Sequence, residues 1–158
     1  MNWQEVCEHP SLQNLPFKIE LNQYGQIVMS PVKFDHSAFQ GEIAFLLRSL
    51  RQHGKTLVEC AIHTRKGTKV ADVAWLSGER YKKNKHKTEC DVAPEICVEV
   101  ISASNTEAEM QEKRELYVET GAQEVWTCEE NGEIHFYDAA KKLERSVLVP
   151  NFPRNIEI

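Results

Sequence analysis

The hydrophobic positions of this chain fall into short runs that are typical of strands and into two longer stretches with helical spacing. Two of the short runs, residues 17–21 and 26–29, flank a turn-prone segment and predict an N-terminal β-hairpin. Residues 57–63 and 70–76 predict two further strands, joined by a turn at residues 66–67. The first half of the chain is therefore expected to be rich in strands.

Two stretches have the spacing of helices. From residue 36 to residue 51 apolar side chains recur at helical intervals, Asp35 is the predicted N-cap, and Gly54 follows as a stop signal. A second helix is predicted to begin after the cap candidates at residues 102–105. It should end at Gly121, because glycine favours the position after a helix C-terminus.

Three more strands are predicted at residues 96–101, 124–128 and 133–137, the last two around a turn at residues 130–132. The element order β-β-α-β-β-β-α-β-β predicts an α/β fold, with a mixed central sheet flanked by helices. Since no repeat, low-complexity segment or linker interrupts this order, residues 1–158 are expected to form one domain.

Composition and charge narrow the class of protein. A chain of 158 residues, 41% hydrophobic and 27% charged, is large enough to bury one core. A net charge of −5 argues against a protein that coats polyanions, so any contact with nucleic acid must be local. The sequence has neither a membrane-length apolar stretch nor an N-terminal signal-peptide pattern, and we expect a cytoplasmic protein that does not contact membranes.

The cysteines are odd in number and scattered through apparent strands and loops, which favours free thiols in a reducing compartment. They are Cys7, Cys60, Cys90, Cys97 and Cys128. A zinc site would have to combine Cys60 and His63 with His86 and Cys90. Strand alternation would put Cys60 and His63 on opposite faces, so we expect ordinary packing rather than converging zinc ligands.

Two strand-like runs each contain one carboxylate. Asp72 lies within residues 70–76 and Glu99 within residues 96–101, although both runs are otherwise rich in the residues that suit a half-buried sheet. A buried carboxylate without compensation costs several kcal/mol. The pair therefore indicates a bound cation, a basic partner side chain or positions that face outward.

Lys113 lies inside the apolar arc of the second predicted helix. That arc consists of Met110, Leu116, Tyr117 and Val118. The helix has an acidic, solvated side that Lys113 does not use, and this placement is unusual for a lysine. The alternative is a lysine that reaches out to solvent, or one paired with Glu109 one turn away, which stabilises a helix by about 0.2–0.5 kcal/mol.

Several sequence segments together resemble the Uma-type restriction endonuclease family of the PD-(D/E)XK nuclease superfamily. The segments are GQIVMSP (residues 25–31), His36 at the start of a helix, ADVAWL around Asp72, PEICVEVISAS (residues 94–104) and EKRELYVETGAQEVW (residues 112–126). The resemblance extends over residues 17–137. Its most specific part is the order E-V-I-S, K-x-x-x-Y, G-x-x-E-x-W.

The resemblance implies a restriction-endonuclease-like core and a metal-dependent nuclease that hydrolyses phosphodiester bonds. The expected substrate is DNA. Asp72 and Glu99 match the acidic ligands of Mg²⁺, for which Mn²⁺ can substitute, with the backbone carbonyl of Val100 as a third ligand. The superfamily lysine normally stands at the position of Ile101. In this chain Lys113 matches a lysine that has moved to the helix, where it would orient the attacking water.

Other candidates are less specific. Glu42, on the first predicted helix, is a candidate for an outer ligand of the metal or of its bound water; the alternative is that it is simply exposed on the surface. Gln40 is expected to face away from the apolar stripe of this helix. His36 is expected to be a surface or capping residue. The only basic run of the chain lies between the two acidic strands and is expected either to contact a phosphate backbone or to be a solvated loop. It contains Arg80, Lys82, Lys83, Lys85 and Lys87.

Two other classes of function stay open at this level. A catalytically degenerate nuclease fold could bind nucleic acid or a protein partner without cleavage, as the isoleucine at Ile101 and the acidic charge suggest. A structural module could use Asp72 and Glu99 in salt bridges with Lys113 or Arg114 alone. The sequence shows no appended DNA-reading domain, so sequence specificity would require a homodimer or a separate protein.

Overall fold

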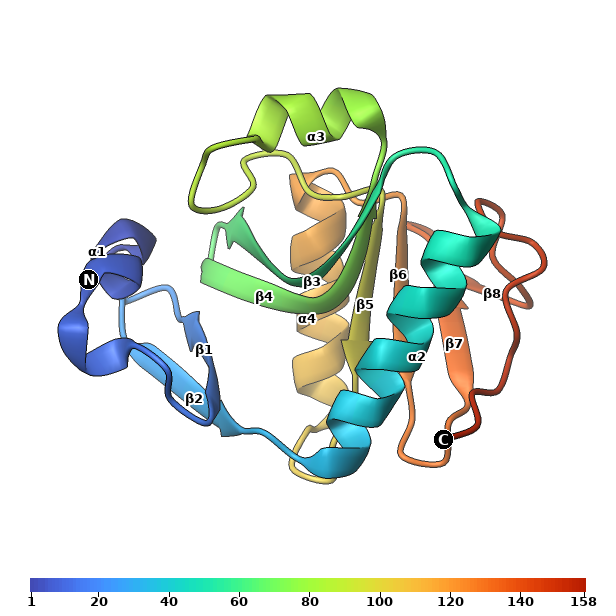
Figure 1. Cartoon of the computed structure of the whole chain (residues 1–158), viewed down its shortest axis with the longest axis horizontal. Helices are drawn as coiled ribbons and strands as arrows, with labels where there is room; N and C mark the ends of the chain where they lie inside the picture. Colours follow the sequence, from blue (N-terminus) through green and yellow to red (C-terminus); the bar gives the residue numbers. More distant parts are fainter.

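A six-stranded mixed sheet forms the centre of the protein, whose computed structural model describes all residues 1–158 (Figure 1). The strand order is β3-β4-β5-β6-β7-β8, and β5 and β6 are parallel while the other neighbours are antiparallel. In chain order the elements are α1 (Trp3–Glu8), the short 3-10 helix η1 (Pro10–Leu12), β1 (Phe17–Leu21), β2 (Ile27–Pro31), α2 (Phe34–Leu50), β3 (Lys55–Thr64), β4 (Gly67–Leu76), α3 (Gly78–Asn84), β5 (Ile96–Val100), α4 (Glu107–Thr120), β6 (Glu124–Cys128), β7 (Ile134–Tyr137) and β8 (Lys142–Leu143).

Helices cover both faces of this sheet. Helix α2 lies on one face, where Phe39, Ile43 and Leu47 are buried in the larger hydrophobic cluster (Figure 1). Helix α4 lies on the other face and contributes Tyr117 to the second cluster. It also forms the crossover between the parallel strands β5 and β6, as a parallel pair requires. All residues of these two strands are buried, which explains why most of their side chains are apolar.

Strand β4 departs from regular alternation next to the candidate site. Ala71 belongs to the cluster under α4 and Val73 to the cluster under α2, although residues two apart on a strand normally share a face. Asp72 lies at this break. On the neighbouring strand, Glu59 lies between the paired residues Val58 and Cys60 and has a φ of 53°. Such a backbone conformation is rare for a residue other than glycine and is found more often near functional sites.

The N-terminal hairpin β1–β2 is a separate two-stranded sheet that lies beside β4 (Figure 1). The side chain of Glu20 accepts a hydrogen bond from the backbone N–H of Val70 at 2.6 Å. Lys69 donates to the backbone carbonyl of Leu21 at 3.1 Å. These two contacts hold β1 over β4 and so bring the polar face of the hairpin to the strand that carries Asp72.

The predicted α/β fold is confirmed, including the mixed sheet, its flanking helices and the N-terminal hairpin. Two predicted helix starts are wrong. Helix α2 begins at Phe34 after Lys33, so Asp35 lies in the first turn and is not the N-cap. Helix α4 begins after Thr106, which forms a capping box with Glu109. Gly121 ends α4 as predicted, with a φ of 121°.

Four elements were not predicted. They are α1, η1, α3 and β8. The connector at residues 77–91 contains α3, whose N-terminus is capped by the Ser77 side chain. Beyond β8, Val149, Phe152 and Ile156 pack into the cluster under α2. No helix is both long and apolar enough to cross a membrane.

One buried carboxylate of the sheet serves the fold. Glu124, at the start of β6, is 2% exposed and accepts four hydrogen bonds. Its Oε1 accepts from Trp126 Nε1 at 2.8 Å and Ser146 Oγ at 2.7 Å. Its Oε2 accepts from the backbone N–H groups of Val147 at 3.0 Å and Leu148 at 2.9 Å. Glu124 therefore ties the segment after β8 to the central sheet.

Candidate active site

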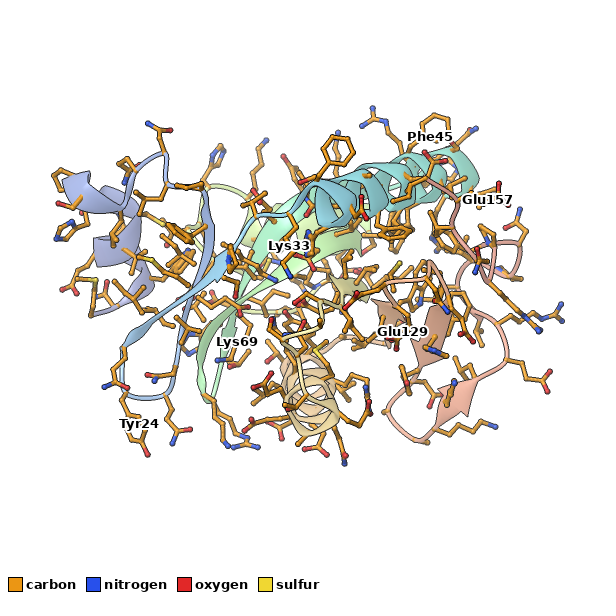
Figure 2. The ribbon with its side chains drawn as sticks, turned by 90° about the horizontal axis from the view of Figure 1, so that it is seen from below. Tyr24, Lys33, Phe45, Lys69, Glu129 and Glu157 are labelled. Atoms are coloured by element: carbon orange, nitrogen blue, oxygen red, sulfur yellow. The ribbon has the colours of Figure 1, made fainter.

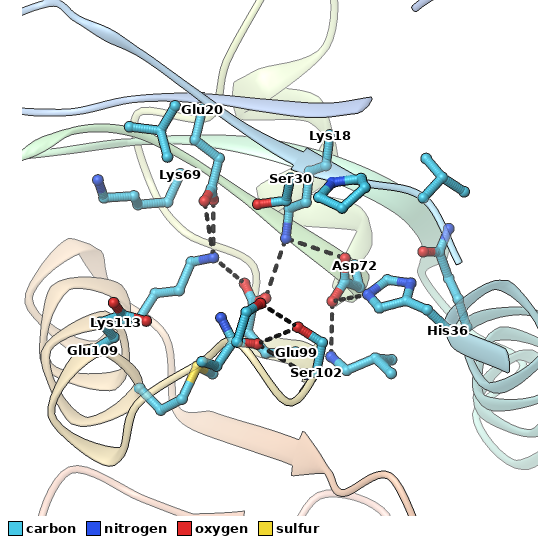
Figure 3. Close-up of a pocket in the computed structure, with 18 of the residues that line it drawn as sticks. Lys18, Glu20, Ser30, His36, Lys69, Asp72, Glu99, Ser102, Glu109 and Lys113 are labelled. Atoms are coloured by element: carbon cyan, nitrogen blue, oxygen red, sulfur yellow. Dashed lines mark hydrogen bonds and ion pairs between the residues drawn. The ribbon is translucent and has the colours of Figure 1, made fainter. Parts of the chain in front are cut away.

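A cavity of about 450 Å³ lies where the hairpin, the first turns of α2 and the N-terminal half of α4 meet the edge of β4 and β5 (Figure 3). Asp72, Glu99 and Lys113 all line it. Lys33 and Lys69, which also line the cavity, lie between the hairpin on one side and the two helices on the other in Figure 2. The structure therefore brings together three residues that the sequence predicted as one site.

Asp72 is held from three directions. It is 1% exposed, and its Oδ2 accepts a hydrogen bond from the backbone N–H of Val100 at 2.7 Å. The Nε2 of His36 lies 3.4 Å from the same oxygen, and the Nζ of Lys18 lies 3.1 Å from Oδ1. Burial alone would raise the pKa of Asp72, but the Lys18 charge and the His36 hydrogen bond outweigh it and hold the pKa below its ordinary value.

Glu99 is equally buried, at 3% exposure. Its Oε1 accepts a hydrogen bond from the hydroxyl of Tyr117 at 2.6 Å and lies 3.2 Å from Lys113 Nζ. Its Oε2 lies 3.2 Å from Lys18 Nζ. Burial dominates here, so the pKa of Glu99 is raised despite the charges of Lys113 and Lys18. The two neighbouring carboxylates thus differ in how strongly each holds its charge.

Lys113 points into the cavity, as its place in the apolar arc of α4 predicted (Figure 3). Its Nζ lies 2.9 Å from Glu20 Oε2 as well as 3.2 Å from Glu99. Tyr117 lies one helical turn further along α4, so both side chains reach the same oxygen of Glu99. The alternative of a pair between Lys113 and Glu109 does not occur, because Glu109 caps the start of the helix.

Two residues of the hairpin complete the site and were missed. Lys18 and Glu20 lie two apart on β1 and both line the cavity. Burial would lower the pKa of Lys18, but the charges of Glu99 and Asp72 outweigh it and raise the pKa above its ordinary value. Burial would raise the pKa of Glu20, whereas the charges of Lys113 and Lys18 lower it. The only available signal was the alternation of polar residues along β1, which is also typical of a solvated strand face.

Two expectations for α2 are corrected. His36 is not a surface or capping residue, because it faces Asp72 in the cavity (Figure 3). Its hydrogen bond with Asp72 raises the pKa of His36 above 6.5. Gln40, one turn after His36, lines the cavity instead of facing away. Glu42 is exposed and does not line the cavity, so the structure does not bring it to the other candidates.

The basic run lies away from the cavity. Helix α3 follows β4 at the end of the sheet where β5 begins, whereas Val100 and the cavity lie where β5 ends (Figure 1). The guanidinium of Arg80 donates to the backbone carbonyls of Ala93 at 2.8 Å and Gly121 at 2.7 Å, so it serves the fold. The other basic residues of this run are exposed; they are Lys82, Lys83, Lys85 and Lys87.

The donor set of the cavity fits a divalent cation in its chemistry. Asp72 and Glu99 present carboxylate oxygens, which Mg²⁺ and Mn²⁺ prefer, and Mg²⁺ commonly uses only one or two of them. The side chains do not form a group of three or more acidic, histidine or cysteine ligands. Lys18 Nζ, within 3.2 Å of both carboxylates, lies between them. A cation bound by both carboxylates would therefore take the place that the ammonium group holds.

Comparisons with known proteins give the family of this chain and support its fold. The Uma2 family, described as "Putative restriction endonuclease", matches residues 3–156. A crystal structure of "a putative nuclease belonging to DUF820" from Anabaena variabilis superimposes with a TM-score of 0.69. The alignment has 18% sequence identity and covers 89% of this chain and 81% of the other, so it supports the fold. No curated protein matches the sequence. Because the family match extends over nearly the whole chain, this protein belongs to the Uma2 family.

Proposed function

We propose that this protein is a nuclease that depends on a divalent metal and hydrolyses phosphodiester bonds in DNA. The observation that carries the proposal is the convergence of two buried carboxylates and one lysine, from β4, β5 and α4, in a single cavity. Family membership supports the nuclease class. Ordinary packing does not account for the arrangement, since each charge is removed from water at considerable cost.

Asp72 and Glu99 would hold the metal through their carboxylate oxygens, and Val100 would add its backbone carbonyl. When bound, Mg²⁺ or Mn²⁺ would polarise a phosphoryl oxygen of the substrate and make a bound water molecule more acidic. The Val100 N–H and the Tyr117 hydroxyl each donate to one carboxylate and so fix its orientation. Such supporting hydrogen bonds around metal ligands keep the ligands in place.

Lys113 would orient the attacking water and neutralise charge that develops on the phosphate. Its side chain is 15% exposed and lines the cavity, while its Nζ contacts Glu99. A preorganised ammonium group in a water-poor site stabilises a developing negative charge far more than the same group in bulk water. This role is the one that the superfamily lysine would have at Ile101.

The substrate would approach from the open side of the cavity. Besides Lys33 and Lys69, the hydroxyl and amide groups of Ser102, Ser104 and Asn105 line the cavity and suit phosphate oxygens. Contact between the exposed lysines of α3 and the DNA backbone stays a separate proposal, because those residues lie at the other end of β5. A homodimer would place two such cavities in one assembly and is likewise proposed, not observed.

A second candidate function has one observation in its favour. Lys18 contacts both carboxylates and neutralises part of their charge without a metal. Such a site would suit a module that binds nucleic acid and does not cleave it. The two candidates are separated by incubating the purified protein with plasmid and single-stranded DNA in Mg²⁺, in Mn²⁺ and in a chelator. We expect cleavage with either metal and none with the chelator. Binding without cleavage under every condition would favour the second candidate.

A further inference from the structure

Lys18 is the one cation of the cavity that touches both candidate metal ligands. Its Nζ lies 3.1 Å from Asp72 Oδ1 and 3.2 Å from Glu99 Oε2 (Figure 3). Lys113, by contrast, contacts Glu99 and Glu20 only. The side chain of Lys18 is 16% exposed and belongs to the hairpin, not to the central sheet that carries the two ligands.

The ammonium group and a metal ion cannot share this position. Mg²⁺ binds carboxylate oxygens at about 2.0–2.1 Å, and the oxygens in question are those within 3.2 Å of Lys18 Nζ. Two cations at such short separation repel each other strongly where water is scarce. Metal binding to both carboxylates therefore requires that Lys18 leaves.

We propose that Lys18 is a displaceable internal counter-ion: it holds the Asp72 and Glu99 pair in the metal-free protein and competes with the metal for it. This inference rests on the proposed function, because it assumes that the pair binds a divalent cation. Its consequence is that the metal affinity of the protein is set partly by the hairpin and not only by the ligands.

The hairpin is suited to such a role. Apart from Lys18, β1 is tied to the site through Glu20, which contacts Lys113 and the Val70 N–H. These contacts do not involve Asp72 or Glu99, so they can persist when Lys18 moves. The lysine side chain is long and flexible, and it can turn from the carboxylates to the open cavity without a shift of the backbone. There it would meet the phosphate groups of a substrate.

The test is Mn²⁺ binding measured by calorimetry, which does not depend on activity. Lys18→Met keeps most of the apolar stem and removes the competing charge, so it should bind Mn²⁺ about tenfold or more tightly than the wild type. Lys33→Met is the matched control, because Lys33 lines the same cavity and its side chain contacts neither ligand. Its affinity should change far less. Adding Asp72→Asn to Lys18→Met should abolish the gain.

Equal or weaker Mn²⁺ binding by Lys18→Met would overturn the competition while leaving the metal site in place. If neither the wild type nor Lys18→Met binds Mn²⁺, the competition and the metal-dependent mechanism both fail. Tighter binding by Lys18→Met without DNA cleavage by the wild type would support the competition and contradict the nuclease proposal. The outcomes thus separate the two ideas.

A second measurement uses the wild type, in case Lys18→Met does not fold. Acetylation of lysines by a water-soluble reagent is followed by mass spectrometry, with Mn²⁺ and with a chelator. We expect Lys18 to be protected in the chelator and to react faster with Mn²⁺, while the reaction of Lys33 serves as an internal reference. Protection of Lys18 that is unchanged by saturating Mn²⁺ would contradict displacement.

Discussion

Glu124 and the Asp72–Glu99 pair are buried carboxylates of the same sheet, and the protein satisfies them in opposite ways. Four neutral donors surround Glu124, with no basic side chain among them. Asp72 and Glu99 receive one donor each from a backbone N–H or a hydroxyl. The ammonium groups of β1 and α4 and the imidazole of His36 on α2 supply the rest. Neutral donors, two of them backbone N–H groups, suit a permanent structural role. Flexible basic side chains carried by the elements around the sheet suit a site where one cation can replace another.

The largest effect is expected at Lys113. Lys113→Met keeps the apolar stem and removes the charge, so metal-dependent DNA cleavage should fall by about 10²-fold or more, the scale for loss of a preorganised charge-stabilising group. Thermal unfolding and Mn²⁺ binding measured beside the cleavage rate should show that the fold and the metal site persist. If Lys113→Met cleaved DNA at the wild-type rate, Lys113 would have no part in the mechanism. The contrast between a functional carboxylate pair and the structural Glu124 would then be weaker.

The next largest effect is a loss of stability when the structural carboxylate, Glu124, is changed. Glu124→Gln puts an amide donor against two of the four hydrogen-bond donors, so the free energy of unfolding should fall by about 1.5–3 kcal/mol. Denaturant unfolding with and without Mn²⁺ would measure it, and the loss should not depend on the metal. Glu130→Gln, at an exposed position after the same strand, is the control. A loss that becomes larger in Mn²⁺ would mean that Glu124 also belongs to a cation site, because the metal would then stabilise the wild type more than the variant.

A smaller effect concerns pH in the metal-free protein. The pKa of His36 is raised above 6.5 in the folded state, mainly by its hydrogen bond with Asp72. A raised pKa means that the protonated form stabilises the fold, so the contribution is fully present below pH 6.5 and is lost as the pH rises through the folded-state pKa. In a chelator, the wild type should exceed His36→Gln in stability more at acidic than at alkaline pH.

Stability of the two proteins in denaturant, measured over this pH range, provides the check. His86→Gln removes one histidine at an exposed position and serves as the control. A stability difference between wild type and His36→Gln that grows as the pH rises would show that His36 stabilises Asp72 only in its neutral form.

The smallest effect is expected on α3. Replacing Lys82, Lys83 and Lys85 with alanine removes exposed charges that lie away from the cavity, so cleavage and folding should persist. If these lysines contact phosphates, DNA affinity should weaken and its dependence on salt should become shallower, because fewer counterions are released. Binding measured at several salt concentrations decides this, and equal slopes would assign the run to a solvated surface.

Most of the fold follows from local sequence patterns. Strand and helix periods, a turn at residues 130–132 and a glycine after α4 act over a few residues, so they can be recognised without knowledge of distant contacts. The missed helix α3 lacks such a signal, because no side chain in it is buried. Helix α1 is short, and short helices depend on tertiary contacts more than on their own sequence.

The candidate site could be predicted only where a charge interrupts an apolar context. Asp72, Glu99 and Lys113 satisfy that condition. Lys18 does not, since it alternates with apolar residues as any solvated strand residue would, and its partners lie 54 and 81 residues away in the sequence. The position of Glu42 outside the cavity has a related cause. The apolar stripe of α2 faces the sheet, and the side that faces the cavity is set by the position of the hairpin.

The comparison between the two kinds of buried carboxylate has one direct test, the shift of the melting temperature by Mn²⁺ in four proteins. The wild type and Glu124→Gln should both gain stability, by about 2.7 kcal/mol at a hundredfold excess over the Kd. Asp72→Asn and Glu99→Gln should gain none at the same concentration. A shift in Asp72→Asn and Glu99→Gln as large as that of the wild type would contradict the assignment of this pair as the metal site.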